Sequence, residues 1–315
     1  MKSTVNIVLV TILAGGTGSV KLVRGLSRQG IQISVISNVA DNFWHNGLYV
    51  CPDLDTMMYG LSGILDKEKG WGIQGDTFNF LKQMHMLNQE SWFKVGDRDL
   101  ATHLLRTSLL RKGNSLSWIT DYLRKKYHIK SRIIPATNSH VETRMKTTAG
   151  NLHIQEFWLK YTGNLAVRKI WYDGINKAKA SKEALSSIKK ADFVVFAPGN
   201  PISSIGPILA ISEIRKALKI ARNKSIAVSP LIGNIPISGP AKKYMKTAGI
   251  KISVAGLVSF YKDVVSRIVI AKSDLCYQKK IGNMGVKAYF SEILMKNEKD
   301  EVKLAETILK IMEKN

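Results

Sequence analysis

A buried apolar run that ends in a cluster of glycines constrains this chain more than any other feature. Residues 5–13 are almost continuously apolar, and Gly15-Gly16-Thr17-Gly18 follows at once. A run of this kind is typical of a parallel strand that is covered on both faces. The glycines predict a tight turn, and residues 20–28 then show helical apolar spacing. We interpret the run as a strand and not as a signal peptide, since no cleavage-type segment follows it.

The strand-to-helix rhythm returns in the C-terminal half. Such alternation predicts an α/β fold, a Rossmann-like doubly wound, mostly parallel sheet with an inserted mixed α/β region. We expect a single domain over 1–315, with a core of 1–65 and 186–315 and an insertion, 66–185, packed on that core. Further strands are predicted at 32–37, 132–134, 152–159, 167–171, 192–197, 225–229 and 264–270, with an extended piece at Val254, and further helices at 52–65, 78–87, 100–111, 116–127, 206–221, 241–248 and 300–313.

The composition indicates a basic globular protein. With 47 Lys and Arg against 24 Asp and Glu, the formal net charge is +23, which favours an acidic partner. Such partners are a nucleic acid, an anionic surface or a phosphorylated small molecule. The charge is spread along the chain without the interleaved aromatics of RNA-binding motifs, so we interpret it as a solvated basic surface and expect no nucleic-acid partner. A transmembrane run of about 18 apolar residues is lacking, so we expect no membrane partner. The two cysteines form no disulfide framework, which favours the cytoplasm.

The glycine cluster is the first candidate binding element. Glycines between a strand and a helix let backbone N–H groups approach a phosphate, and the helix N-terminus adds partial positive charge. Lys21 follows one turn later. The spacing fits neither the Walker A loop nor the dinucleotide-binding fingerprint. The alternative is a tight turn with no ligand.

A pair of acids follows the second predicted strand. Asp53 and Asp55 stand next to Pro52, with Asp41 and His45 shortly before them. In a loop or a first helical turn, two such carboxylates can converge on one hard cation. Mg²⁺ prefers one or two carboxylates together with substrate phosphate oxygens, so we predict a magnesium site at Asp53 and Asp55. The alternative is that these acids only cap the helix that begins near Pro52.

Two further segments place polar residues beside predicted helices. Lys94 and Arg98 precede the helix at 100–111 and can hold a phosphate, with helix caps and ion pairs as the alternative. The loop 197–207 follows a predicted strand at its carboxyl end, where open α/β sheets bind ligands; an ordinary connecting loop is the alternative. Its residues that suit a nucleotide are Asn200, Ser203, Ser204 and Gly206.

Together these segments resemble the 2-phospho-L-lactate transferase family, the enzymes that assemble the deazaflavin coenzyme F420. The resemblance covers residues 10–270, and each of its motifs is weak alone, but their order and spacing are specific. The matching pieces are Ala14-Gly15-Gly16-Thr17-Gly18 with Lys21-Leu22, Pro52-Asp53-Leu54-Asp55-Thr56, Trp71-Gly72, Gly75-Asp76-Thr77-Phe78, Gly96-Asp97-Arg98-Asp99 with Ala101-Thr102-His103, Asn200-Pro201 with Ser204-Ile205-Gly206-Pro207, and Ser229-Pro230 with Gly239-Pro240-Ala241.

The resemblance implies a specific reaction. The donor is a guanosine diphosphate diester of a small acid, 2-phospholactate or a phosphoenolpyruvate relative, and the acceptor is the ribityl chain of the deazaflavin Fo. The terminal hydroxyl of Fo attacks the phosphorus that bears the small acid, and GMP leaves. Such a transfer needs in-line positioning, a carboxylate that accepts the hydroxyl proton and a metal that neutralises phosphate charge, so Mg²⁺ is the expected cofactor.

The resemblance also implies roles for single residues. Asp53 helps to hold magnesium, Asp55 and Lys94 contact Fo, and the two acids form the catalytic pair. The candidate neighbours of the Fo ring are Trp44, His45 and Trp71. The residues implied for the donor's phosphates and guanosine are Gly15, Gly16, Thr17, Gly18, Lys21, Arg98, Asn200, Ser203, Ser204 and Gly206.

The chain departs from the family pattern in several places. Asn42 stands where the family has an acid, Cys51 and Gly199 replace serines, and residues 136–140 lack the family's Met-Ser-Asp-Asp-Pro type of segment. These departures leave open which small acid the donor carries, and a homodimer is also left open. The alternative function is that of a nucleotide-sugar-binding regulator resembling the gluconeogenesis factors, which share the glycine loop; the motifs at 52–56 and 96–103 argue against it.

Overall fold

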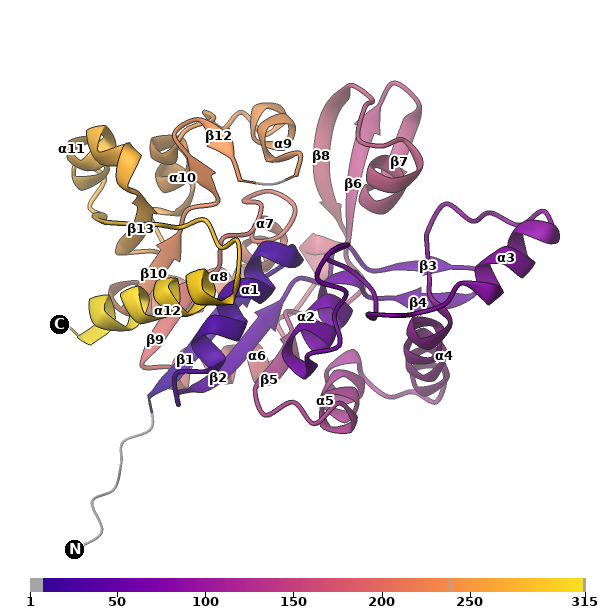
Figure 1. The fold of residues 1–315 in the computed structure, drawn as a ribbon. Helices are drawn as coiled ribbons and strands as arrows, with labels where there is room; N and C mark the ends of the chain where they lie inside the picture. The colour runs from indigo at the N-terminus through magenta and orange to yellow at the C-terminus, as the bar shows by residue number, and fades with distance from the viewer. Residues whose placement is uncertain (1–7, 238, 314–315) are drawn as a thin grey trace, which may run out of the picture.

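A parallel sheet forms the centre of the computed structural model, which describes residues 8–237 and 239–313. Within those residues seven strands pair in parallel, in the order β14-β13-β10-β9-β1-β2-β5 (Figure 1). The α/β fold predicted from the sequence is therefore confirmed. The strands are β1 (Leu9–Ala14), β2 (Gln32–Ser37), β5 (Arg132–Pro135), β9 (Phe193–Phe196), β10 (Ser225–Val228), β13 (Arg267–Ala271) and β14 (Lys287–Ser291).

The strand order reverses at β1. From β1 the chain first moves outward to β2 and β5, and it later returns to β9 on the other side of β1 before it continues to β10, β13 and β14. At such a reversal the loops that follow neighbouring strands diverge, and a crevice opens at their carboxyl ends. The two loops concerned are the predicted glycine loop after β1 and the 197–207 loop after β9.

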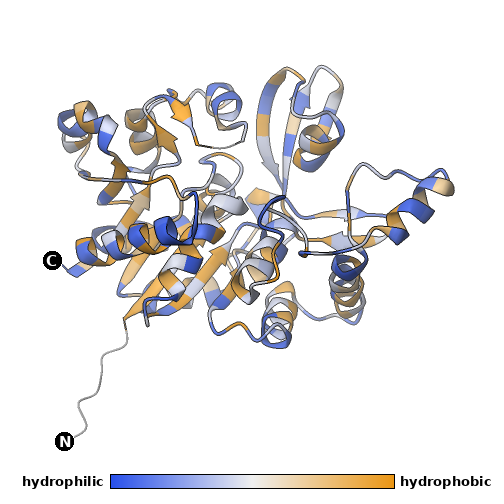
Figure 2. Ribbon diagram, viewed as in Figure 1, coloured by the Kyte–Doolittle hydropathy of each residue, from blue (hydrophilic) through white to orange (hydrophobic). Residues whose placement is uncertain are grey.

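Helices cover both faces of the sheet. Val10 and Ile12 of β1 pack in one apolar cluster and Leu13 packs in the other, as alternation along a strand requires. In Figure 2 the strands are mostly orange and the outer faces of the helices are mostly blue. The first cluster is covered by α1 (Gly16–Ser27), α2 (Pro52–Ser62), α5 (Leu116–Lys126) and α12 (Glu298–Glu313), and the second by α6 (Lys182–Lys190), α7 (Gly206–Ala210), α8 (Ser212–Ile220) and α10 (Val254–Tyr261).

Two excursions leave this core (Figure 1). The first contains the hairpin β3 (Phe43–His45) and β4 (Leu48–Val50) with helices α3 (Asn79–Met86) and α4 (Asp97–Arg111). The second is a small antiparallel sheet in the order β7-β6-β8, with a π-helical turn between β7 and β8 in the chain. Its elements are β6 (Glu142–Thr147), β7 (Gly150–His153), η1 (Glu156–Lys160) and β8 (Val167–Asp173).

The predicted insertion at 66–185 is divided by a core strand. β5 lies inside that range, yet it pairs with β2 in the central sheet. Its neighbours α5 and α6 also pack on the core. The remaining short elements are η2 (Ile175–Lys177), η3 (Arg222–Lys224), β11 (Leu231–Ile232), β12 (Ile235–Pro236), α9 (Ala241–Thr247), η4 (Lys272–Tyr277) and α11 (Gln278–Gly282). Within the described ranges, every helix is too short or too polar to cross a bilayer.

Several predicted elements need correction. Val254, predicted to be extended, begins α10, and Ser253 caps that helix by accepting a hydrogen bond from the Gly256 N–H at 3.1 Å. The strand predicted at 152–159 ends at His153, because the Glu156 carboxylate accepts from the His153 N–H at 2.9 Å and η1 follows. The helix predicted at 206–221 is interrupted by the extended residue Ile211. Residues 5–7 of the first predicted strand lie outside the described residues.

The two excursions meet at an aromatic contact. The His153 imidazole stacks on Phe43 with ring centroids 5.2 Å apart, and its Nδ1 accepts a hydrogen bond from the Gln155 N–H at 3.2 Å. Burial, assisted by the nearby Arg144 charge, lowers the pKa of His153 to about 4. A neutral ring is therefore part of this junction at physiological pH.

Acidification is expected to weaken the fold through this ring. The unfolded chain takes up the proton near pH 6.5, whereas the folded ring does so only near pH 4, so stability is full above pH 6.5 and falls as the pH drops toward 4. The shift corresponds to about 3 kcal/mol. Urea unfolding of His153→Gln across this window should show a flatter decline than the wild type. His85→Gln, which removes an exposed imidazole, is the control, and a His153→Gln variant that declines like the wild type would contradict the assignment.

Candidate active site

A cavity of about 930 Å³ opens at the carboxyl end of the sheet, where the strand order reverses. Its walls come from the loops after β1, β9, β10 and β14, from the start of α2 and from both excursions. The lining is drawn from residues 15–18, 52–59, 69–72, 92–94, 154–159, 198–204, 230–244 and 293–296. The core strands and the excursions thus share one site.

The glycine loop packs directly against the loop after β9. A Cβ atom at Gly15 would lie 2.8 Å from Cβ of Ser204, and one at Gly199 would lie 3.0 Å from the Gly15 carbonyl oxygen. Gly16 has a φ of +74°, which favours glycine. Ser19 Oγ closes the turn by donating to the Gly15 carbonyl at 2.7 Å. Two backbone stretches therefore meet at the N-terminus of α1, where N–H groups and partial positive charge suit an anion.

The loop after β9 is shaped by its own asparagine. Asn200 Oδ1 accepts hydrogen bonds from the N–H groups two and three residues further on, at 2.9 and 3.2 Å. Asn200, Ser203 and Ser204 border the cavity. Gly206 lies outside the lining formed by the described residues, and a Cβ atom there would collide with the Tyr172 hydroxyl. Gly206 is thus a packing position in α7.

Asn38 joins two acids to both loops. Its Nδ2 donates to Asp53 Oδ2 at 2.9 Å, to Asp41 Oδ1 at 3.1 Å and to the Ser203 carbonyl at 3.1 Å. The other Asp53 oxygen, Oδ1, accepts from the Gly16 N–H at 2.8 Å. Burial and the neighbouring Asp53 charge raise the pKa of Asp41 well above its usual range, and burial raises the pKa of Asp53. The Asn38 amide therefore binds both acids and the β9 loop directly, and it is connected to the glycine loop through Asp53.

The Asp41–Asp53 pair is suited to a divalent cation. Two buried carboxylates that disfavour each other's ionisation gain from a cation that neutralises both. Throughout the described part of the chain, no group of three or more His, Cys, Asp or Glu side chains gathers as a metal cage. Mg²⁺ usually binds through one or two carboxylates and completes its shell with water and phosphate oxygens. A two-carboxylate site completed by a phosphate is the arrangement that these residues can offer.

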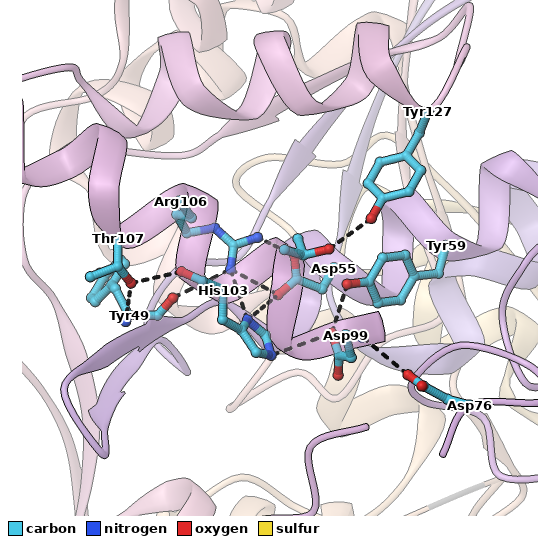
Figure 3. A network of polar contacts seen from close by, with 10 residues as sticks. Tyr49, Asp55, Tyr59, Asp76, Asp99, His103, Arg106, Thr107 and Tyr127 are labelled. Atoms are coloured by element: carbon cyan, nitrogen blue, oxygen red, sulfur yellow. Dashed lines mark hydrogen bonds and ion pairs between the residues drawn. The ribbon is translucent and has the colours of Figure 1, made fainter. Parts of the chain in front are cut away.

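The Asp55 carboxylate is bound by a different residue from those that bind Asp53. Asp55 lies on α2 two positions after Asp53, and its carboxylate faces the buried Arg106 of α4 (Figure 3). Arg106 Nη1 donates to Asp55 Oδ2 at 3.0 Å, and Nη2 donates to Oδ1, so the guanidinium engages both oxygens. Burial raises the pKa of Asp55, and the Arg106 charge opposes that shift. The two acids of the predicted metal site therefore have separate partners, and neither is directed to the N–H groups of its own helix.

Arg106 belongs to a polar network along α4 (Figure 3). His103 Nδ1 lies 3.5 Å from Asp55 Oδ2, and its Nε2 lies 3.3 Å from Asp99 Oδ1, which also accepts a hydrogen bond from the Tyr59 hydroxyl at 2.6 Å. All of these except Arg106 border the cavity. The sequence analysis missed Arg106 and gave Asp99 and His103 no role of their own. Their spacing, i, i+4 and i+7 on one helix face, is the signal that could have grouped them.

Lys21, Trp71 and Lys94 border the cavity. Lys21 Nζ donates to the Met295 carbonyl at 2.9 Å, which ties the segment after β14 to the helix that carries the glycine loop. Trp71 and Lys94 come from the first excursion, with the aromatic residues 92 and 93 beside Lys94. These three predicted residues are thus brought together with the acids and both loops.

Trp44, His45 and Arg98 stand outside the lining that the described residues form. Trp44 is 51% exposed and packs on an aromatic ring of β4. His45 turns the other way, against Trp92, with ring centroids 5.0 Å apart. Arg98 Nη1 donates to the Gln74 carbonyl at 3.2 Å. On a strand, successive side chains point to opposite faces, so neighbours in the sequence need not share a site.

Comparison with known proteins identifies the family. A family model described as 2-phospho-L-lactate transferase CofD matches residues 10–315. The 2-phospho-L-lactate transferase of Methanopyrus kandleri is 39% identical over 306 residues, covering 96% of this chain and 97% of that protein. The enzyme of the same name from Methanosarcina acetivorans is 37% identical over 300 residues, covering 95% of this chain and 97% of that protein.

Solved structures share the fold. A protein of the UPF0052 family from Bacillus halodurans superposes with a TM-score of 0.62 at 18% identity, covering 96% of this chain and 99% of that chain. At this identity the likeness shows the fold alone. The family model and the relatives of similar length carry the assignment, and the chain belongs to the 2-phospho-L-lactate transferase family.

Proposed function

We propose that this chain transfers a 2-phospholactyl or phosphoenolpyruvyl group from a guanosine diphosphate diester to the deazaflavin Fo, with release of GMP, in coenzyme F420 biosynthesis. One observation carries the proposal: the Gly16 N–H donates to Asp53 Oδ1 at 2.8 Å, which brings a phosphate-binding turn and a buried acid pair into contact at a large cavity. Membership of the transferase family supports the same reaction.

The donor would lie with its phosphates at the N-terminus of α1. The Gly15 and Gly16 N–H groups donate to Ser19 Oγ and Asp53 Oδ1, so the backbone N–H groups of Thr17 and Gly18, the helix dipole and the Lys21 ammonium are what favour an anion there. The loop after β9 packs against this turn and would border the guanosine through Asn200, Ser203 and Ser204. The two strands at the order reversal thus both contribute to the donor side.

Mg²⁺ is the proposed cofactor, and Asp41 and Asp53 would hold it. When bound, it would offset the negative charge of the donor's phosphate oxygens. Asn38 keeps the two carboxylates adjacent, and the Gly16 N–H orients Asp53. Asp55, predicted as a second ligand, is assigned to the acceptor side because Arg106 engages both of its oxygens.

Fo would enter along the excursions. Its planar ring suits the aromatic side chains that border this part of the cavity, among them Trp71 and Trp158, and Lys94 can donate to a ring oxygen. The terminal hydroxyl would then meet Asp55. As its oxygen attacks phosphorus and the bond to GMP breaks, Asp55 would take up the hydroxyl proton.

The direct test is transfer in solution. The purified chain is incubated with Fo, the diester donor and Mg²⁺, GMP release is followed, and the product is identified by mass spectrometry. One GMP released per phosphorylated Fo is expected. A chain that releases no GMP, and whose melting temperature rises with a UDP-sugar but not with Fo or GDP, would instead be the nucleotide-sugar-binding regulator.

Gly18→Val is expected to weaken donor binding selectively. A Cβ atom at Gly18 would lie 3.1 Å from the Pro198 carbonyl, so a branched side chain would push the β9 loop away from the turn. GDP affinity measured by calorimetry should fall at least about tenfold, which corresponds to about 1.4 kcal/mol, while Fo affinity by fluorescence titration changes little. Gly282→Val, where the added Cβ meets nothing within 4 Å, is the control. Equal loss of both ligands would mean that the turn is only structural.

Asp53→Asn is expected to remove most of the transfer activity. The amide keeps the size of the side chain but lacks the charge that would attract the cation, so GMP release should fall by orders of magnitude and recover in part at raised Mg²⁺. Thermal melting should stay close to that of the wild type. Asp121→Asn, on the surface of α5 where Asp121 pairs with Arg124, is the control. Normal turnover in Asp53→Asn would exclude a catalytic role for this acid.

A further inference from the structure

Arg106 is a buried cation whose function its own helix does not explain. Its side chain is 1% exposed, and it stands behind the cavity wall, not in it. Burial alone would lower its pKa, but the Asp55 carboxylate holds that pKa above the usual range. A buried ion pair is costly to desolvate and often adds little stability, so its presence beside a cavity calls for a specific role.

The guanidinium is held rigidly from several sides. Besides Asp55, its Nη1 contacts the Tyr49 carbonyl at 3.4 Å and His103 Nδ1 at 3.2 Å. The hydroxyl of the next residue, Thr107, accepts a hydrogen bond from the Tyr49 N–H at 2.8 Å and donates one to the His103 carbonyl at 2.7 Å. Both backbone polar groups of Tyr49 thus bind α4, which fixes Arg106 relative to the hairpin β3–β4.

The other end of α4 is fixed as well. Asp76 accepts hydrogen bonds from the N–H groups of Arg98 and Asp99 at 2.9 and 3.0 Å, in the first turn of the helix. Asp97 in turn accepts from the N–H groups of Asn79 and Phe80 at 3.0 and 2.9 Å. The helix that carries Arg106 is therefore anchored at its N-terminus and again at its middle.

We propose that Arg106 is a positioning residue for the acceptor: its planar fork sets the orientation of the Asp55 carboxylate in the cavity wall and offsets its charge. This inference rests on the proposed function, because it takes Asp55 to meet the hydroxyl of Fo. A carboxylate oxygen has more lone-pair sites than the guanidinium uses, so Asp55 can still accept one hydrogen bond from the cavity. A lysine would supply the charge without the fork and would leave the carboxylate free to rotate.

The same pairing separates Asp55 from the cation. Its two oxygens are engaged by Arg106, whereas the Asp53 oxygens receive only a backbone N–H and the Asn38 amide. Removal of the guanidinium should therefore impair acceptor binding and turnover without changing the affinity of the Asp41–Asp53 pair for a divalent cation.

The first experiment compares ligands. Arg106→Lys and Arg106→Gln are assayed for Fo affinity by fluorescence titration, GDP affinity by calorimetry, and turnover. Both variants should lose at least about tenfold in Fo affinity or turnover, or about 1.4 kcal/mol, with GDP affinity unchanged. Arg111→Gln, on the same helix with its guanidinium exposed, is the matched control. Full activity in Arg106→Lys would show that the two-pronged guanidinium is not required. An equal loss of affinity for Fo and for GDP would mean that Arg106 has only a structural role.

The second experiment needs neither Fo nor turnover. Mn²⁺ binding in the presence of GDP is followed by electron paramagnetic resonance in Arg106→Gln, Asp55→Asn and Asp53→Asn. Only Asp53→Asn should lose the bound ion; loss in either of the others would overturn the separation of roles. If the Arg106 variants fail to fold, Asp55→Asn alone decides, since it should weaken Fo binding and spare Mn²⁺ and GDP. A wild type that transfers nothing to Fo would defeat the proposed function, while the Mn²⁺ result would still stand.

Discussion

The Asn38 side chain donates hydrogen bonds to Asp41, to Asp53 and to the carbonyl of Ser203, 165 residues away in the chain, and the arrangement of the cavity depends on this shared amide. It lies at the end of β2, next to the point where the strand order reverses. Without a donor between them, two buried carboxylates would repel each other and seek water. With it, Asp41 and Asp53 can stay adjacent, and the Ser203 carbonyl draws the β9 loop toward them. Because Asn38 directly follows β2, these hydrogen bonds set the positions of the two carboxylates relative to the parallel sheet.

The sequence predicted the core well because burial on both faces leaves a clear record. β9 is apolar throughout and β1 is interrupted only by Thr11, and turns with glycine or proline separate such strands from amphipathic helices. β6 was missed because Met145 is the one apolar residue among Glu142–Thr147, so no apolar alternation marks the strand. α10 was missed because an entirely apolar run has no period, so only the Ser253 cap distinguishes a buried helix from a strand.

The predicted site residues that directly follow a strand do lie together at the cavity, whereas the sequence missed residues that meet only through folding. The glycine loop, the acids after Pro52 and the β9 loop all lie next to recognisable elements. Arg106 is 51 residues from Asp55 along the chain, and only the packing of α4 on β4 brings them together. Trp44 and His45 are close to the acids in sequence, yet neither lines the cavity: Trp44 is exposed, and His45 packs behind Trp92 of the cavity wall. Proximity in sequence fixes neither the face nor the direction of a side chain.

The site is thus divided by origin. The core strands build the half with the glycine loop and the acid pair, and the two excursions build the aromatic half and its polar wall. The stacked rings of His153 and Phe43 join the two excursions to each other.

The contact between Lys21 and the Met295 carbonyl has a consequence for biosynthesis. The segment at 293–296 forms part of the cavity wall but is translated after every other part of that wall. The helix that follows it, α12, packs on α1, the helix that begins in the glycine loop. A nascent chain therefore lacks this part of the cavity wall until residues 293–296 have been made, and a ligand of the complete cavity can stabilise the fold only after that point.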